Sequence, residues 1–212
     1  MIEYIIPHNP DDRILKKADE LLQAGEIICF PTDTNWILAA SSENKVGIEK
    51  LYKIKHESKQ KHFSLLCSHI SMASEVAIID NQAFKFLKMI TPGHYTFIFE
   101  ATKKIAKHVQ ASKTDKEVGI RIVPLDFVSS IIDAHGHSLV STNIPMNLLN
   151  LPEDSEEPIY SFMLEENISH LVAMIIDPGE HEFAGPSTIF NFTSDEAPVL
   201  VREGAGSVEG LY

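Results

Sequence analysis

The chain has 212 residues, of which 44% are hydrophobic and 23% charged, so it is long enough to bury a substantial core. A formal net charge of −12 argues against a surface coated with nucleic-acid-binding charge, and any RNA contact has to be focused on a local patch. No apolar run approaches the ~20 residues of a membrane span, and the amino terminus lacks the basic region of a signal peptide. We therefore expect a single domain over residues 1–212, located in the cytoplasm and without membrane contact.

The first predicted helix begins around Asn9-Pro10-Asp11-Asp12, where a capping side chain precedes a proline and two acids. Gly25 ends it. The residues from Glu26 to Phe30 then read as a strand buried on both faces, which Pro31 terminates by removing a backbone donor.

The strand leads into Thr32-Asp33-Thr34, two hydroxyls that flank a carboxylate. The ends of sheet strands are where α/β proteins place ligand sites, and this group could orient a substrate or bind a hydrated metal. The same side chains could instead only cap a turn, because Thr and Asp bond readily to local backbone.

A second helix, with Ser42 as its expected cap, runs into a lysine-rich stretch from Lys50 to His62. In an acidic protein this cluster has two interpretations. It is either a solvated helix end that complements the helix dipole, or a phosphate or carboxylate site in which Lys55 and Lys59 share one helical face.

Two further segments are predicted to pack in the core. The strand from Phe63 to Cys67 contains one of the only two cysteines, and both Cys29 and Cys67 are expected to be free core thiols. The helix from Asp80 to Ile90 is expected to bury a face that includes Phe84.

Polar or basic side chains mark the later predicted strands. Arg121 lies in the apolar strand from Val118 to Val123 and must be paired with an acid or directed into a cleft. The other strands cover residues 139–143, 172–176, 186–192 and 198–202, and the residues from Asn147 to Pro158 are expected to form an exposed loop.

Seven stretches in this order resemble the YrdC-like family, whose best-known members are L-threonylcarbamoyladenylate synthases. They are FPTDT (30–34), KIKHESK (53–59), TPGHYTFIF (91–99), VGIRIVP (118–124), LVSTN (139–143), PSTIF (186–190) and VREGAG (201–206). The resemblance implies an α/β fold, a twisted mixed β-sheet with flanking helices around an open, positively lined cavity.

The resemblance also implies a function. Such an enzyme is a nucleotidyltransferase that joins ATP, threonine and bicarbonate to give threonylcarbamoyl-AMP and pyrophosphate, for threonylcarbamoyladenosine modification of tRNA. Holding the amine near the anion and placing cations on the developing charge suits this chemistry. Mg²⁺, held largely by phosphates and water, is the implied metal, and no protein ligand for it is assigned.

Carried over by position, the resemblance assigns two groups of residues. Thr32 and Thr34 would line the threonine pocket. The nucleotide would be bound by Lys55, Lys59, Arg121, Ser141, Asn143, Ser187 and Arg202. No catalytic residue is assigned.

Two motif positions depart from the family pattern. The arginine of its KxR motif falls at Glu57, and its SxN motif aligns with Asn143-Ile144-Pro145, so that Ser141-Thr142-Asn143 keeps the letters about 7 Å along the strand. These departures are similar to those of the YciO branch. We therefore expect a YciO-type nucleotide-binding protein with weakened or altered synthase chemistry.

Two alternatives come from other classes. In the first, the basic cavity binds double-stranded RNA or tRNA without catalysis. In the second, His135-Gly136-His137 suggests a metal hydrolase, although an HxH beside a helix-ending glycine is typical of a loop.

Overall fold

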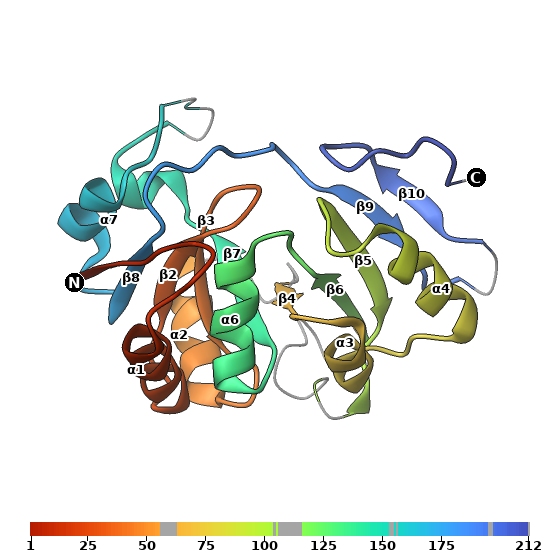
Figure 1. Ribbon diagram of the computed structural model, residues 1–212, viewed down its shortest axis with the longest axis horizontal. Coiled ribbons are helices and arrows are strands. Elements are labelled where there is room, and N and C mark those ends of the chain that lie inside the picture. Colours follow the sequence, from red (N-terminus) through yellow and green to blue (C-terminus); the bar gives the residue numbers. More distant parts are fainter. Residues whose placement is uncertain are drawn as a thin grey trace.

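The computed structural model describes residues 1–55, 63–103, 105, 116–152, 155, 157–194 and 197–211. Within these residues ten strands form one sheet (Figure 1). The strands are β1 (Ile2–Tyr4), β2 (Ile28–Pro31), β3 (Trp36–Ser41), β4 (Ser64–Leu66), β5 (Tyr95–Glu100), β6 (Glu117–Arg121), β7 (Leu139–Asn143), β8 (Met174–Asp177), β9 (Thr188–Asn191) and β10 (Val199–Arg202).

The sheet is mixed, with the strand order β1-β8-β2-β3-β7-β4-β6-β5-β9-β10. Parallel pairs join β8 to β1 and β2, β4 to β6, and β5 to β9. The antiparallel pair of β2 and β3 is a hairpin whose turn is the Thr32–Asn35 segment. The predicted threonine-pocket residues, Thr32 and Thr34, therefore lie on a tight turn between two strands.

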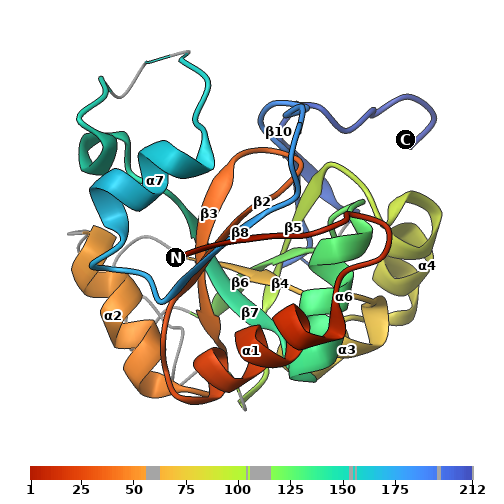
Figure 2. The ribbon, with the colours of Figure 1, turned by 60° about the vertical axis from the view of Figure 1, so that its left-hand side comes forward.

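The described helices flank this sheet. They are α1 (Asp12–Gln23), α2 (Lys45–Lys55), α3 (Ile70–Val76), α4 (Asn81–Ile90), α6 (Asp126–His135), the 3-10 helix η1 (Met146–Leu149) and α7 (Ser161–Ile168). Helices α1 and α6 pack side by side, and α2 packs against β3 (Figures 1 and 2). In the described part of the chain no helix is long and apolar enough to cross a membrane.

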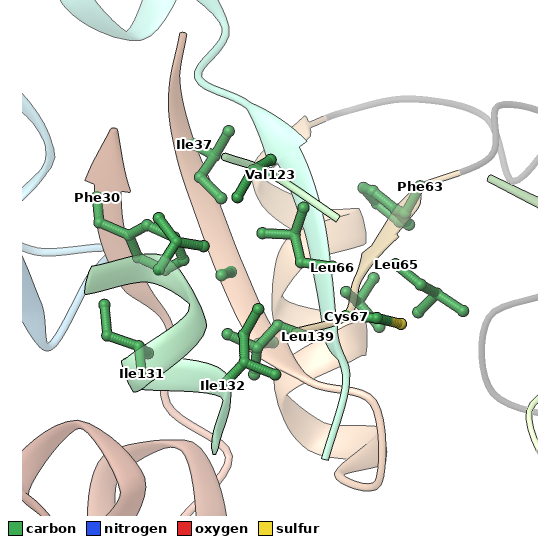
Figure 3. Close-up of a cluster of buried hydrophobic side chains, with 14 of the residues drawn as sticks. Phe30, Ile37, Phe63, Leu65, Leu66, Cys67, Val123, Ile131, Ile132 and Leu139 are labelled. Carbon is green, nitrogen blue, oxygen red and sulfur yellow. The ribbon is translucent and has the colours of Figure 1, made fainter. Parts of the chain in front are cut away.

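A continuous apolar core lies under these helices. Phe30 of β2 and Leu139 of β7 lie near Ile131 and Ile132 of α6, and Ile37 of β3 lies beside Val123 (Figure 3). All six residues of β3 are buried, because the strand is covered on both faces. The predicted strand begins at Ile28 rather than Glu26 and includes Pro31, and the prediction that it is buried is confirmed by its four buried residues.

The helix boundaries needed three corrections. Asp11, rather than Asn9, caps α1, and its carboxylate accepts a hydrogen bond from the Arg13 backbone. Asn44, rather than Ser42, accepts hydrogen bonds from the Val46 and Gly47 amides, because it directly precedes the first helical residue. The loop expected from Asn147 begins inside η1.

The buried face of α4 also differs from the prediction. Phe84 is 42% exposed, whereas Phe86 is 8% exposed and packs edge-on against Phe190 and Phe192, with ring centroids 5.1 and 5.4 Å apart. The predicted neighbours Ala83 and Leu87 are buried. The apolar stripe is thus rotated toward the aromatic side chains of β9 and the residue that follows it.

We expect Phe86→Ala to lower the free energy of unfolding by about 3 kcal/mol, because it removes a buried ring and leaves a cavity. Phe84→Ala, two residues away in the same helix, should cost about 1 kcal/mol or less. Urea denaturation of both variants measures the difference. Equal losses would contradict this orientation of α4.

Both thiols should be inert in the folded protein. Cys29 and Cys67 are buried and unpaired with each other, and burial raises the pKa of both thiols well above the ordinary value. Because only the thiolate reacts, a disulfide-exchange reagent at pH 8 should label neither cysteine until denaturant is added. Fast labelling without denaturant would show that one of them is accessible.

Candidate functional site at the β2–β3 turn

The β2–β3 turn is stabilised by hydrogen bonds between its own residues. The Thr32 backbone N–H donates to the Asn35 carbonyl at 2.8 Å, and the Thr32 hydroxyl donates to the same carbonyl at 3.0 Å. The hydroxyls of Thr32 and Thr34 lie 3.2 Å apart. These residues do cap a turn, as one of the two interpretations predicted, and the turn also presents Asp33.

Asp33 is the buried centre of this site. One carboxylate oxygen accepts from Arg121 Nη2 at 2.6 Å, and the other is hydrogen-bonded to His94 Nδ1 at 2.8 Å. Arg121 Nη1 also donates to the Thr34 hydroxyl at 3.0 Å. The expectation that Arg121 is paired with an acid is confirmed, and the acid is the aspartate of the turn.

This contact requires a curled sheet. Arg121 ends β6, and β7 and β4 lie between β3 and β6 in the strand order. Three strand spacings amount to about 14 Å in a flat sheet, which is beyond the reach of an arginine and an aspartate. The two side chains meet because the strand ends converge, so the sheet is concave here.

Arg121 lies in an unusual electrostatic environment. Burial lowers its pKa from the ordinary value, the Asp33 carboxylate raises it, and the positive charge of Arg202 lowers it. Its Nε atom is buried and has no hydrogen-bond partner among the described residues. Arg121 and Arg202 are therefore close enough to repel each other, although they come from different strands.

The segment that follows β8 forms hydrogen bonds with the turn. His181 Nε2 is 2.8 Å from the Thr32 carbonyl oxygen, and the Ala184 backbone N–H donates to the Asp33 carbonyl at 2.7 Å. Both the backbone carbonyl and the side chain of Asp33 therefore accept hydrogen bonds. This turn is held by contacts to β6, to the start of β5 and to the chain after β8.

Ser187 and Arg202, both predicted site residues, are brought together. Arg202 donates from Nε and Nη2 to the Ser187 carbonyl at 3.1 and 2.7 Å. The Ser187 hydroxyl lies 2.8 Å from that of Thr96 on β5. Because β5 pairs with β6, this group is one strand away from Arg121.

Ser141 and Asn143 occupy the central strand β7. The Ser141 hydroxyl donates to the Ser64 carbonyl of β4 at 3.1 Å, so it already has a structural partner. Asn143 is exposed at the end of the strand, opposite Ile37 of β3. The two residues do not join the Asp33 network by any hydrogen bond between described residues.

Part of the lysine-rich stretch lies outside the described residues. Lys55 ends α2, but its side chain, Glu57 and Lys59 are not among the described parts of the chain. Lys50 of the same stretch forms an ion pair with Glu26 at 2.7 Å. The positive lining expected from Lys55 and Lys59 therefore stays a prediction.

The HxH segment has a structural role in what the structure describes. His135 Nδ1 is 2.8 Å from Asp19 of α1, and its Nε2 is 2.8 Å from the Ser41 hydroxyl. With both ring nitrogens occupied, this histidine fixes α6 to α1 and β3 and has no nitrogen left for a metal ion.

Sequence reasoning missed His94 and His181 as members of the site. His94 lies in a stretch that reads as a turn, and nothing in the sequence places His181 beside residue 32. Asp33 was recognised as a candidate ligand, but its partner could not be identified because Arg121 is 88 residues away in the chain.

These features define an α/β protein with a concave mixed sheet, on which a buried Asp33–Arg121 pair and a second arginine lie at converging strand ends. The family model Sua5_yciO_yrdC, described as "Telomere recombination", matches residues 20–204. The chain belongs to this family.

Several relatives support this assignment. The uncharacterized protein YciO of Escherichia coli K12 is 31% identical over 97% of this chain and 96% of its own length, and a crystal structure of E. coli YciO gives a TM-score of 0.83 over 99% of this chain and 98% of that one. A putative threonylcarbamoyl-AMP synthase of Methanocaldococcus jannaschii is 25% identical over 96% of this chain and 92% of its own. P. abyssi Sua5 complexed with L-threonine shares the fold, with a TM-score of 0.81 and 18% identity over 96% of this chain and 57% of that one.

The Asp33–Arg121 pair should be strongly coupled. Arg121→Met leaves Asp33 buried without its main partner and should lower the free energy of unfolding by about 3–5 kcal/mol. The double variant with Asp33→Asn should lose less than the sum of the single losses, by about 0.5–3 kcal/mol. Chemical denaturation of the four proteins gives this coupling energy.

Arg202→Met is the matched control, because it removes the same charge from an exposed side chain. It should cost no more than about 1.5 kcal/mol. If the Arg121 and Asp33 losses simply add, the ion pair does not hold the strand ends together.

Proposed function

We propose that this protein binds ATP and carries out threonylcarbamoyl-AMP synthase-like chemistry in weakened or altered form. The observation that supports the proposal most is the pair of arginines, Arg121 and Arg202, held within electrostatic reach at converging strand ends. Two cations that repel each other are stabilised by an anion placed between them, and a nucleotide phosphate supplies that charge. The names of the relatives supply the substrate class.

The reaction needs positioning more than a protein nucleophile. The threonine amine and bicarbonate form a carbamate with loss of water, and a carbamate oxygen then bonds to the α-phosphorus of ATP while the bond to pyrophosphate breaks. Arg121 and Arg202 would stabilise the charge that develops on the phosphates. The Thr34 hydroxyl, which accepts a hydrogen bond from Arg121, would contact the threonine substrate.

In this proposal Mg²⁺ binds together with the nucleotide, as Mg–ATP. Within the described residues no group of three or more His, Cys, Asp or Glu side chains could hold a metal ion. Mg²⁺ is commonly carried by substrate phosphates and water, and it would supply charge neutralisation there. We therefore assign it no protein ligand.

The proposed weakening of synthase activity follows from a substitution in the KxR motif. Where the synthase pattern has an arginine two residues after Lys55, this chain has Glu57, which reverses the charge offered to an anionic substrate. RNA binding without catalysis stays the alternative. It depends on Lys59 and its neighbours, which the structure does not describe.

We expect calorimetry to detect Mg–ATP binding, and pyrophosphate release to require threonine and bicarbonate together. Arg202→Ala should lower the rate of release at least about tenfold, because it removes a cation from the developing charge. Arg13→Ala is the control, since Arg13 is exposed on α1 and pairs only locally with Asp11. Glu57→Arg should raise the rate by restoring the motif cation.

Two results would contradict the proposal. One is no binding of ATP or AMP at millimolar concentration. The other is tight, steeply salt-dependent RNA binding in the absence of any nucleotide turnover, which would favour the RNA-binding alternative.

A further inference from the structure

A cavity lies beside the β2–β3 turn. Its volume is about 1020 Å³, and it is bordered by residues 34–36, by Met146, by residues 155 and 157–162 before and at the start of α7, and by residues 177 and 179–183 at the end of β8 and after it. These last two segments run near each other in both ribbon views (Figures 1 and 2). The volume suits a ligand of drug size.

The lining of this cavity combines acids and aromatic rings. Glu157 stands on one wall and Glu180 and Glu182 on another, and none of the lining residues that the structure describes is lysine or arginine. Asp177 is engaged by the Ser161 hydroxyl and the Gly179 backbone N–H. The three glutamates form no salt bridge with any other described residue.

Three aromatic side chains of the lining are exposed. Tyr160 and Phe162 are 55% and 56% exposed, and their rings stack with centroids 5.7 Å apart. Phe183 lies on the opposite wall, in an edge-on contact with His181. A cluster of exposed rings inside a cavity marks a binding surface rather than a packing defect.

We propose that this cavity binds a small aliphatic oligoamine. Ammonium groups are attracted both to carboxylates and to the faces of aromatic rings, and the methylene chain between two ammonium groups can lie on those rings. A bare divalent cation would leave the rings unused, and an anionic ligand such as a nucleotide would be repelled by the glutamates. The charge and the apolar surface together fit an organic polycation.

This cavity shares one residue with the site that would bind ATP and threonine. Thr34 borders the cavity, and its hydroxyl accepts a hydrogen bond from Arg121; the other described lining residues are not among those assigned to ATP or threonine. The inference rests on the lining of the cavity alone and does not depend on the proposed synthase chemistry.

The chain provides its own reporter for binding. Trp36 is its single tryptophan, it borders the cavity, and its indole N–H donates to the Ile159 carbonyl of the opposite wall at 2.9 Å. A ligand that engages residues 157–162 changes the surroundings of this indole. Tryptophan fluorescence therefore reports on the cavity without any label.

The test is titration of the full chain with spermidine and with 1,4-diaminobutane, followed by tryptophan fluorescence and by calorimetry in the same buffer. Both amines should give saturable binding that weakens as salt is added, and spermidine should bind more tightly. The neutral analogue 1,4-butanediol and MgCl₂ should give no saturable signal. The double variant Glu180→Gln/Glu182→Gln should bind spermidine about tenfold more weakly, and Tyr160→Ala about threefold.

The matched control is Asp133→Asn/Glu166→Gln, which removes two exposed charges from helices without touching the lining. It should leave spermidine affinity within about twofold of the parent. Three results would overturn the proposal: no binding by either method up to about 10 mM amine, equal weakening in the control, or an equal response to 1,4-butanediol.

Discussion

The contact between Asp33 and Arg121 is the constraint on which the rest of this site depends. It joins the β2–β3 turn to the end of β6 across two intervening strands, so it exists only because the sheet is curled. A buried ion pair contributes little net stability compared with apolar residues, but it tolerates the loss of neither partner. Its value here is geometric, because it fixes which strand ends converge.

The same contact explains how two arginines are kept near each other. Arg121 is neutralised on one side by Asp33, while Arg202 is anchored through the carbonyl oxygen of Ser187 and has no acid in that contact. Burial is the main reason that the pKa of Arg121 is lowered, and the positive charge of Arg202 lowers it further. Such a site gains more from an incoming anion than two isolated surface cations would, because binding relieves a repulsion that folding has imposed.

The sequence predicted where the strands end, but it did not predict which strand ends lie close together in space. Hydrophobic runs and Pro31 located β2, and the LVSTN stretch matches β7 at both ends. The partner of Arg121 could be predicted only as some acid, because pairing across the sheet depends on its curl and leaves no local signal. The sequence also predicted that Phe84 of α4 is buried, whereas the buried ring is Phe86. A broad apolar face predicts a helix but does not determine how the helix is rotated about its axis. The family resemblance assigned Ser187 and Arg202 to the nucleotide, a role that periodicity alone does not give.

The position of the β2–β3 turn has a further consequence, because the turn borders both proposed sites, which have opposite charge. Thr34 is bonded to Arg121, while Trp36, two residues later, is bonded to the wall of the acidic cavity through Ile159. If a ligand at either site shifts this turn, the affinities at the two sites are thermodynamically linked. The linkage is reciprocal, so whatever factor an amine imposes on the affinity for an anion, the anion imposes on the affinity for the amine.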